Sequence, residues 1–172
     1  DVFVYNRSDK SSEIVRTGAR PASLETVCRQ DIVIPCVPIS SFRDNLKSIA
    51  PLLKSGSLVI DVCSVKEYPV QWMLDELPGS VSILATHPMF GPDSAADSLQ
   101  ARKICLCRVR VPEKQFHKIK NYLISKGLIV IEASAREHDE QIATSLSLTH
   151  LIGRTLSECG ASALNIDTEG YK

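Results

Sequence analysis

Short apolar runs of strand length alternate along this chain with stretches in which apolar residues recur at helical spacing. The pattern predicts strands at residues 2–5, 32–37, 58–61, 81–86, 104–111 and 128–131. It predicts helices at residues 11–17, 23–29, 41–53, 68–77 and 113–125. Strands that alternate with helices are typical of a parallel sheet covered by helices. We therefore expect an α/β fold with a doubly wound, mainly parallel sheet.

Local signals refine three of these elements. Ser41 stands at the start of the helical spacing in residues 41–53 and is suited to cap that helix. Arginines alternate with apolar residues in 104–111, which predicts a half-exposed strand. Gly127 follows the segment 113–125 and is expected to end its helix.

The carboxyl-terminal part has a different character, because it predicts one long helix instead of further strand and helix pairs. Ser134 and Glu137 have the spacing of a capping box, which marks the start of a helix. We expect this helix to run to about Cys159 and to stop at Gly160.

Three polar residues form a stripe on this long helix. Ser147, His150 and Arg154 are separated by three and four positions, so they share one face among apolar neighbours. A polar stripe on an apolar helix needs a partner. The change of pattern divides the chain into an expected domain at 1–132 and the start of a helical domain at 133–172.

Composition narrows the class of protein. The chain has 172 residues, 44% apolar and 23% charged, which is normal for a soluble globular core. The formal net charge is zero, so bulk electrostatics indicate neither nucleic acid nor a membrane as a partner. The six cysteines include no C-x-x-C pair, which fits neither a disulfide framework nor a zinc site. We expect no metal.

Two strand ends carry residues that can perform chemistry. His87 follows an apolar strand in a loop punctuated by proline and glycine, and Ser64 and Lys66 follow the strand 58–61. The carboxyl ends of adjacent parallel strands meet at the edge where doubly wound sheets bind ligands. We expect all three side chains to face one crevice. Alternatively, His87 fills a strand end, Ser64 caps the following helix and Lys66 is solvated.

These residues belong to motifs that run the length of the chain. The motifs are Asn6-Arg7-Ser8-Asp9, residues 61–67, residues 86–94, His138-Asp139, residues 149–154 and residues 166–171. Their order and spacing resemble the arogenate/prephenate dehydrogenases of tyrosine biosynthesis, most closely the plant-type arogenate dehydrogenases. The resemblance implies a Rossmann-like nucleotide-binding domain, followed here by the first helix of a helical domain.

The resemblance implies an NADP-dependent oxidative decarboxylation of arogenate or prephenate, helped by aromatisation of the ring. His87 is then the catalytic base for the hydroxyl proton, and Ser64 hydrogen-bonds the same hydroxyl or His87. The residues expected to bind substrate are His150, Asp97, Ser147 and Lys66. His150 could instead be a hydrogen-bonded core residue, and His138-Asp139 could only cap the long helix.

Asp97 decides which substrate we expect. Its carboxylate would attract the ammonium of arogenate and repel the keto acid prephenate, so we favour arogenate. Asp93, which is nearer to His87 in the sequence, is a rival for this role. In the alternative reading, Asp97 caps a loop or faces solvent.

The residues expected to bind the cofactor are Asn6, Arg7, Ser8 and Ser40. Arg7 comes just after the strand 2–5, where NAD-binding folds place an acidic residue for the ribose 2′-hydroxyl. An arginine there pairs instead with the 2′-phosphate of NADP, and Ser8 can bond the same phosphate. Asp9 would disfavour the phosphate if it pointed inward.

Two other functions stay open. β-Hydroxyacid dehydrogenases share this architecture, but they typically use a catalytic lysine on the interdomain helix, which here carries none. We expect the chain to be truncated at both ends, without the family's first strand and glycine-rich loop, and inactive alone. The third reading is therefore a non-catalytic Rossmann module. For the full-length protein we expect a small-molecule substrate, a homodimer, and a cytoplasmic location or, in a plant, the plastid stroma.

Overall fold

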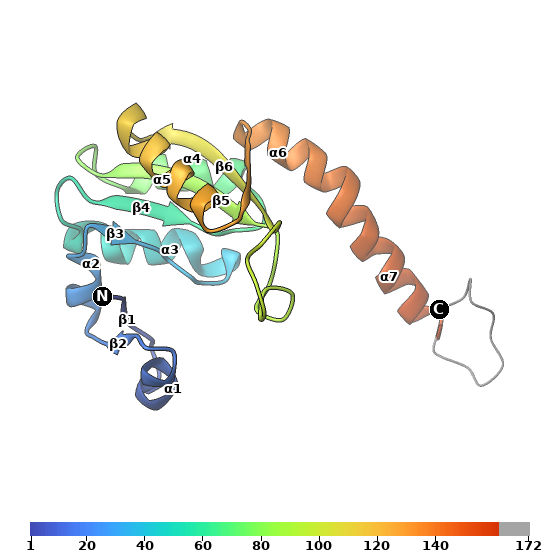
Figure 1. Cartoon of the computed structure of the whole chain (residues 1–172), viewed down its shortest axis with the longest axis horizontal. Helices are drawn as coiled ribbons and strands as arrows, with labels where there is room; N and C mark the ends of the chain where they lie inside the picture. The colour runs from blue at the N-terminus through green and yellow to red at the C-terminus, as the bar shows by residue number, and fades with distance from the viewer. Residues whose placement is uncertain (162–172) are drawn as a thin grey trace.

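The computed structural model describes residues 1–161, and its centre is a five-stranded sheet (Figure 1). The strands lie in the order β3-β4-β5-β6-β7. Their bounds are Ile32–Val33 for β3, Leu58–Asp61 for β4, Ser82–Pro88 for β5, Lys103–Arg110 for β6 and Ile129–Glu132 for β7. Neighbouring strands are parallel except β5 and β6, which are antiparallel. The predicted α/β fold with a mainly parallel sheet is confirmed.

Strand β6 departs from the sequence prediction in its burial. Ile104, Cys105, Leu106 and Cys107 are all buried, so the expectation of a half-exposed strand is wrong for this part. The two cysteines join one hydrophobic cluster, and the isoleucine and leucine join the other. The strand is buried on both sides because packed layers cover both faces of the sheet. It runs antiparallel to β5 because a loop, and no crossover helix, connects the two.

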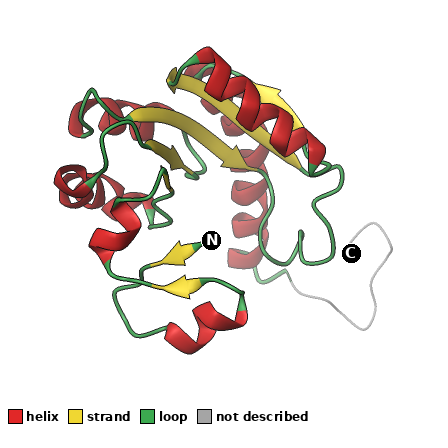
Figure 2. Ribbon diagram, turned by 60° about the vertical axis from the view of Figure 1, so that its left-hand side comes forward, coloured by secondary structure: helices red, strands yellow, loops and turns green. Residues whose placement is uncertain are grey.

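Helices cover the two faces of the sheet (Figure 2). Around it lie α3 (Ile39–Ile49), the 3₁₀ turn η1 (Ala50–Leu52), α4 (Glu67–Glu76) and α5 (Glu113–Ser125). Phe42 and Leu46 of α3 and Met73 of α4 belong to the cluster on one face. Phe116 of α5 belongs to the cluster on the other face. Burial of these side chains, each worth about 2–3 kcal/mol, fixes the helices to the sheet in the doubly wound arrangement.

The start of α3 corrects one prediction. The helix begins at Ile39, directly after Pro38, so Ser41 lies inside the first turn and is not the N-cap. The Ser41 hydroxyl donates to the Pro38 carbonyl at 3.0 Å. Ser40 lies beside it in the same turn and is exposed.

The amino-terminal residues form a small unit next to the sheet (Figure 1). Its elements are β1 (Phe3–Val4), α1 (Ser11–Arg16), β2 (Arg20–Pro21) and α2 (Leu24–Cys28). β1 and β2 pair in parallel as a separate two-stranded sheet. The sequence did not predict β2, because Arg20-Pro21 contains no apolar run. Cys28 is buried in the cluster that also holds α3 and so connects this unit to the core.

The long helix begins as predicted and leaves the sheet region (Figure 1). It consists of α6 (Ala135–Ile142), a π-helical turn (Ala143–Ser147) and α7 (Leu148–Glu158). The capping box is confirmed, since Ser134 accepts from the Glu137 amide at 3.1 Å and Glu137 accepts from the Ser134 amide at 2.8 Å. No residue of α7 is buried. The motif at 166–171 lies outside the described residues.

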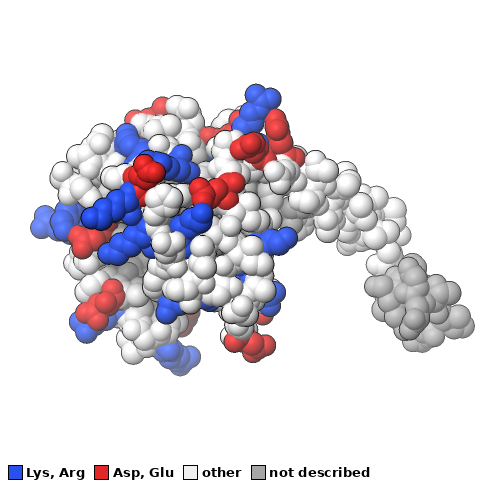
Figure 3. Space-filling model, turned by 45° about the horizontal axis from the view of Figure 1, so that its top comes forward, with Lys and Arg blue, Asp and Glu red and all other residues white. Residues whose placement is uncertain are grey.

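Two surface properties complete the description. On the face shown in Figure 3, basic and acidic side chains are interspersed, in line with the formal net charge of zero. None of the helices in residues 1–161 combines the length and the apolar content that crossing a membrane requires.

Candidate active site

His87 lies near the carboxyl end of β5, in the middle of the sheet. Apolar residues before it form the buried part of the strand, and only 7% of His87 itself is exposed. Asp61, the last residue of β4, pairs in register with Ala85. The ends of these two parallel strands therefore meet at one edge of the sheet, as the sequence predicted for the ligand-binding edge.

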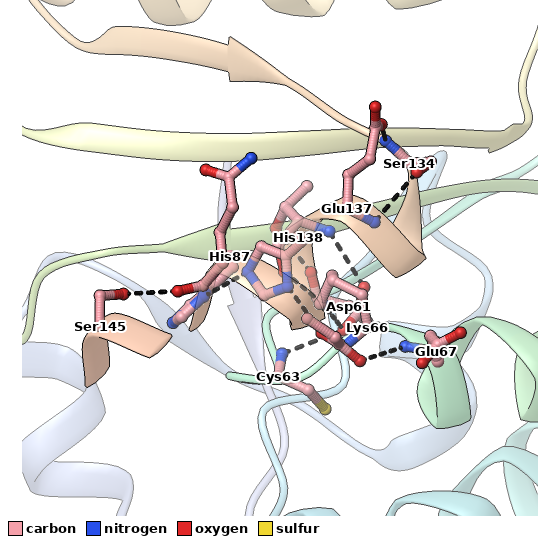
Figure 4. A network of polar contacts seen from close by, with 12 residues as sticks. Asp61, Cys63, Lys66, Glu67, His87, Ser134, Glu137, His138 and Ser145 are labelled. Carbon is pink, nitrogen blue, oxygen red and sulfur yellow. Dashed lines mark hydrogen bonds and ion pairs between the residues drawn. The ribbon is translucent and has the colours of Figure 1, made fainter. Parts of the chain in front are cut away.

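A chain of hydrogen bonds connects His87 to the long helix (Figure 4). Nδ1 of His87 lies 2.8 Å from Nε2 of His138, and the two rings meet edge to face at 70°. Nδ1 of His138 in turn lies 2.7 Å from a carboxylate oxygen of Asp139. The three residues form a relay from α6 to the strand end.

Asp139 has a second role that the sequence analysis missed. Its two carboxylate oxygens accept from the backbone amides of Lys66 at 2.7 Å and Glu67 at 2.9 Å, at the start of α4. Asp139 thus caps α4, and the reading in which His138-Asp139 caps its own helix is wrong. The available signal was that His138 lies four residues before Ile142, on the buried side of α6.

The surroundings set the protonation of these groups. Burial, followed by the electrostatic effects of His138 and Lys66, lowers the pKa of His87 to about 4, while Asp139 opposes this shift. Burial raises the pKa of Asp139, but hydrogen bonds from the Glu67 amide, from His138 and from the Lys66 amide outweigh it and lower the pKa overall. At neutral pH, His87 is therefore uncharged and Asp139 is ionised.

Lys66 is part of a buried network and not of an open site. Its ammonium is fully buried and donates to the Asp61 carboxylate and to the Thr86 carbonyl. The same carboxylate accepts from the amides of Cys63 and Thr86, each at 3.0 Å. These hydrogen bonds inside the protein offset part of the cost of burying the two charges. This geometry contradicts the predicted contact of Lys66 with substrate, because the Lys66 side chain is fully buried.

Ser64 and Cys63 lie in the segment between β4 and α4. Ser64 is exposed at the same sheet edge as His87. It does not cap α4, whose N-cap is Lys66. Burial, followed by the charge of Asp61, raises the pKa of the Cys63 thiol to about 12, so this cysteine is not a nucleophile at neutral pH.

The other residues expected to bind substrate are not gathered around His87. Asp97 is exposed in the loop between β5 and β6, and Ser147 and His150 are exposed on the projecting helix. Arg154 pairs with Glu158 on the surface of α7 at 2.9 Å. A substrate or a further part of the protein would have to connect these residues to His87.

Three of the four residues expected to bind the cofactor, Asn6, Arg7 and Ser8, line a hollow of about 140 Å³ between β1 and α1. Asn6 donates to the carbonyl and the hydroxyl of Ser8, each at 3.0 Å, which folds the loop around Arg7. Asp9 accepts from the Ser11 amide at 3.0 Å and is thereby held at the start of α1. Ser40 does not line this hollow. In residues 1–161, no cluster of three or more His, Cys, Asp or Glu side chains is placed to hold a metal.

Comparison with known proteins gives the family. The family described as "Prephenate dehydrogenase, nucleotide-binding domain" matches residues 5–132. Arogenate dehydrogenase 1, chloroplastic, of Arabidopsis thaliana is 33% identical over 99% of this chain and 28% of its own length. Arogenate dehydrogenase 2, chloroplastic, of the same plant is also 33% identical, over the whole chain and 51% of its own length. The chain thus spans about half or less of these relatives.

Solved structures agree on the fold. The arogenate dehydrogenase of Synechocystis superposes with a TM-score of 0.76 at 18% identity, over 98% of this chain and 67% of that one. Prephenate dehydrogenase from Aquifex aeolicus, in complex with hydroxyphenyl propionate and NAD+, gives a TM-score of 0.77 at 22% identity, over 91% and 59%. The Rossmann-like fold is therefore confirmed. By the match of its sequence to the family model over residues 5–132, the chain belongs to the arogenate/prephenate dehydrogenase family, whose nucleotide-binding domain it contains.

Proposed function

We propose that the complete protein is an NADP-dependent dehydrogenase that oxidises and decarboxylates arogenate, with prephenate as the alternative substrate, in tyrosine biosynthesis. The observation that carries the proposal is the charge and the hydrogen bonding of His87. It is uncharged at neutral pH, and one ring nitrogen is engaged by His138 at the ligand-binding edge of the sheet. The names of the two Arabidopsis relatives support arogenate and, for a plant protein, a plastid location.

The reaction needs a base for the ring hydroxyl of the substrate. Nε2 of His87, the nitrogen that does not contact His138, accepts the hydroxyl proton while the hydroxyl-bearing carbon loses a hydride. Ser64, at the same sheet edge, hydrogen-bonds the hydroxyl and orients it. The ring carboxylate then leaves as CO₂, because its loss makes the ring aromatic. NADP, when bound, supplies the hydride acceptor.

The hollow between β1 and α1 is the proposed site of the 2′-phosphate of NADP. Arg7 supplies a guanidinium for a charge-assisted pair, and Ser8 supplies a hydroxyl. Asp9 also lines the hollow and its charge would repel a phosphate, but its carboxylate accepts from the Ser11 amide at the start of α1. Arg7 and Ser8 are the residues that favour NADP over NAD.

The choice of arogenate depends on Asp97. Its carboxylate is exposed in the loop that follows His87, where it is open to the ammonium of a bound substrate. Ser147 and His150, on the helix that leaves the same edge, are proposed to complete the substrate site. A prephenate side chain, which carries a keto group, would gain nothing from Asp97.

The test is turnover of the complete protein with each substrate and each cofactor, in the wild type and in His87→Asn. Asparagine can fill the space but cannot accept the proton, so kcat should fall by about 10²–10⁴-fold while NADP still binds. His117→Asn is the matched control, because His117 is an exposed histidine on α5. Near-normal turnover of His87→Asn would remove His87 from the chemistry. Failure of the wild type to oxidise either substrate would overturn the proposed function.

A further inference from the structure

The hydrogen-bond relay behind His87 has a direction. Asp139 is ionised, so its oxygens can only accept, and Nδ1 of His138 must donate to it. In the proposed relay His138 is neutral, so it carries its one ring hydrogen on Nδ1 and a lone pair on Nε2. That nitrogen faces His87 at 2.8 Å and can only accept, so the hydrogen of His87 is on Nδ1. Nε2 of His87 is then left as the unprotonated nitrogen.

We propose that His138 and Asp139 are positioning residues for His87, which fix its tautomer and its ring orientation so that Nε2 is the nitrogen that accepts the substrate proton. The inference rests on the proposed function and adds two residues to it. A free neutral imidazole carries its hydrogen on either nitrogen, so a base without this relay would spend part of its time in the wrong tautomer. Both residues act through His87 and are not required to touch substrate.

The relay is anchored by more than its own hydrogen bonds. Asp139 is held in place by the Lys66 and Glu67 amides at the start of α4. His138 is buried, with 4% of its surface exposed. The orientation of the base therefore depends on where α6 docks on α4.

Other charged and titratable groups also surround His87. Asp61 ends β4 and Lys66 lies in the segment that follows it; the two form the buried ion pair, and Lys66 helps to lower the pKa of His87. From β6 comes Cys105, the cross-strand partner of His87. From α6 come His138 and Asp139. Asp139 is thus the negative group whose removal should change the proton affinity of His87 most clearly.

The first experiment needs no turnover. Nitrogen-15 NMR of the histidine rings in the wild-type protein at neutral pH reports which ring nitrogen carries the hydrogen. We expect the Nδ1-H tautomer for both His87 and His138. An Nε2-H tautomer for His87 would overturn the proposal, whatever the activity of the protein.

The second experiment measures the kinetics of Asp139→Asn in the complete enzyme. Asparagine keeps one oxygen for capping α4, but its amide has no charge and can also present a donor to His138. We expect kcat to fall by about 10- to 1,000-fold, with a smaller change in KM. The rate enhancement that a positioned general base supplies sets the upper limit of this fall. The acid limb of the kcat/KM profile should move to lower pH, because Asp139 raises the pKa of His87.

The matched control is Glu140→Gln, which removes the same charge from the next residue of α6. Glu140 is exposed and pairs with Arg136 at 2.8 Å. The pH profile of kcat/KM for Glu140→Gln should therefore match that of the wild type. A fall in kcat for Asp139→Asn with an unmoved acid limb would assign Asp139 a merely structural role and overturn the proposal. If Asp139→Asn does not fold, the ring tautomers of His87 and His138 in the wild-type protein test the proposal instead. If the wild type turns over neither substrate, the proposed function fails, while the NMR experiment still judges the relay.

Discussion

At the scale of single residues, burial of His87 makes the stability of the protein depend on pH. The pKa of His87 is lowered in the folded state from 6.5 to about 4, so the unfolded chain takes up this proton first as the pH falls. The contribution to the free energy of unfolding is complete above about pH 6.5 and is lost as the pH falls toward about 4, by about 3 kcal/mol.

Urea unfolding of the wild type and of His87→Asn at neutral pH and near pH 4.5 measures this contribution. The variant should lose less stability between the two pH values than the wild type does. His117→Asn, which changes an exposed histidine, should behave as the wild type. An equal loss in all three proteins would show that His87 is not the group responsible.

A second prediction at this scale concerns Arg7. If its guanidinium pairs with the 2′-phosphate, Arg7→Ala in the complete enzyme should raise KM for NADP by about 10- to 100-fold and leave the use of NAD nearly unchanged. Arg16→Ala, which changes an exposed arginine at the end of α1, is the control. Equal losses with both cofactors would contradict the assignment.

At the scale of elements, the Asp61–Lys66 pair holds β4, β5 and the start of α4 together. Lys66→Met leaves the Asp61 carboxylate buried without its counter-charge and should cost about 3–5 kcal/mol in the free energy of unfolding. The added change Asp61→Asn should recover part of this loss, because it removes the unpaired charge. Its single oxygen can accept from only one of the Cys63 and Thr86 amides, which bond to different oxygens of the Asp61 carboxylate, so the recovery should be incomplete.

The control for this prediction is Lys54→Met. Lys54 pairs with Asp31 on the surface, where both side chains are more than half exposed, so the variant should lose about 1 kcal/mol or less. Urea unfolding at neutral pH compares the wild type with Lys66→Met, with the double variant and with Lys54→Met. If Lys66→Met alone is as stable as Lys54→Met, the buried pair contributes nothing to the cohesion of these elements.

The sequence could predict those elements whose pattern is local. β4 and α5 match their predicted bounds, and the capping box at Ser134 and Glu137 is present as expected. The strand β2 could not be found, because pairing with β1 and not its own composition makes it a strand. For β6, the alternation of arginines suggested exposure, but the tertiary packing of both faces prevailed.

The same distinction holds for the site. The strand-end position of His87 could be read from the sequence, because it depends on the order of a strand and a loop. The contact of His138 with His87 joins residues 51 positions apart and depends on where α6 docks. The burial of Lys66 likewise follows from the neighbouring strand, which brings the Thr86 carbonyl to its ammonium.

At the scale of the whole molecule, a compact sheet region carries a projecting helix that it does not cover. Leu148, Leu151, Ile152 and Leu156 of α7 are 49–62% exposed. Isolated helices of this length are marginal in water, since most helix stability in proteins comes from packing. We expect backbone amides of α7 in the 172-residue chain to exchange hydrogen far faster than those of α5, which has a similar length but packs on the sheet.

Hydrogen exchange followed by mass spectrometry measures this difference between α7 and α5. Dilution of the protein is the control, because protection of α7 that disappears on dilution would come from another copy of the chain. Protection of α7 equal to that of α5 at every concentration would contradict the view that α7 is uncovered in this chain.

The π-helical turn Ala143–Ser147 has a consequence for how such a protein can change. A π-helical turn holds about one residue more than an α-helical turn, so it takes up an extra residue without turning the helix that follows. An extra residue inside an unbroken α-helix would instead rotate every later side chain by about 100° around the axis. Loss of one residue from the π-helical turn would therefore restore a regular helix and leave His150 facing nearly the same direction relative to His138. The long helix can change its length by a single codon here without redirecting the row of side chains on α7.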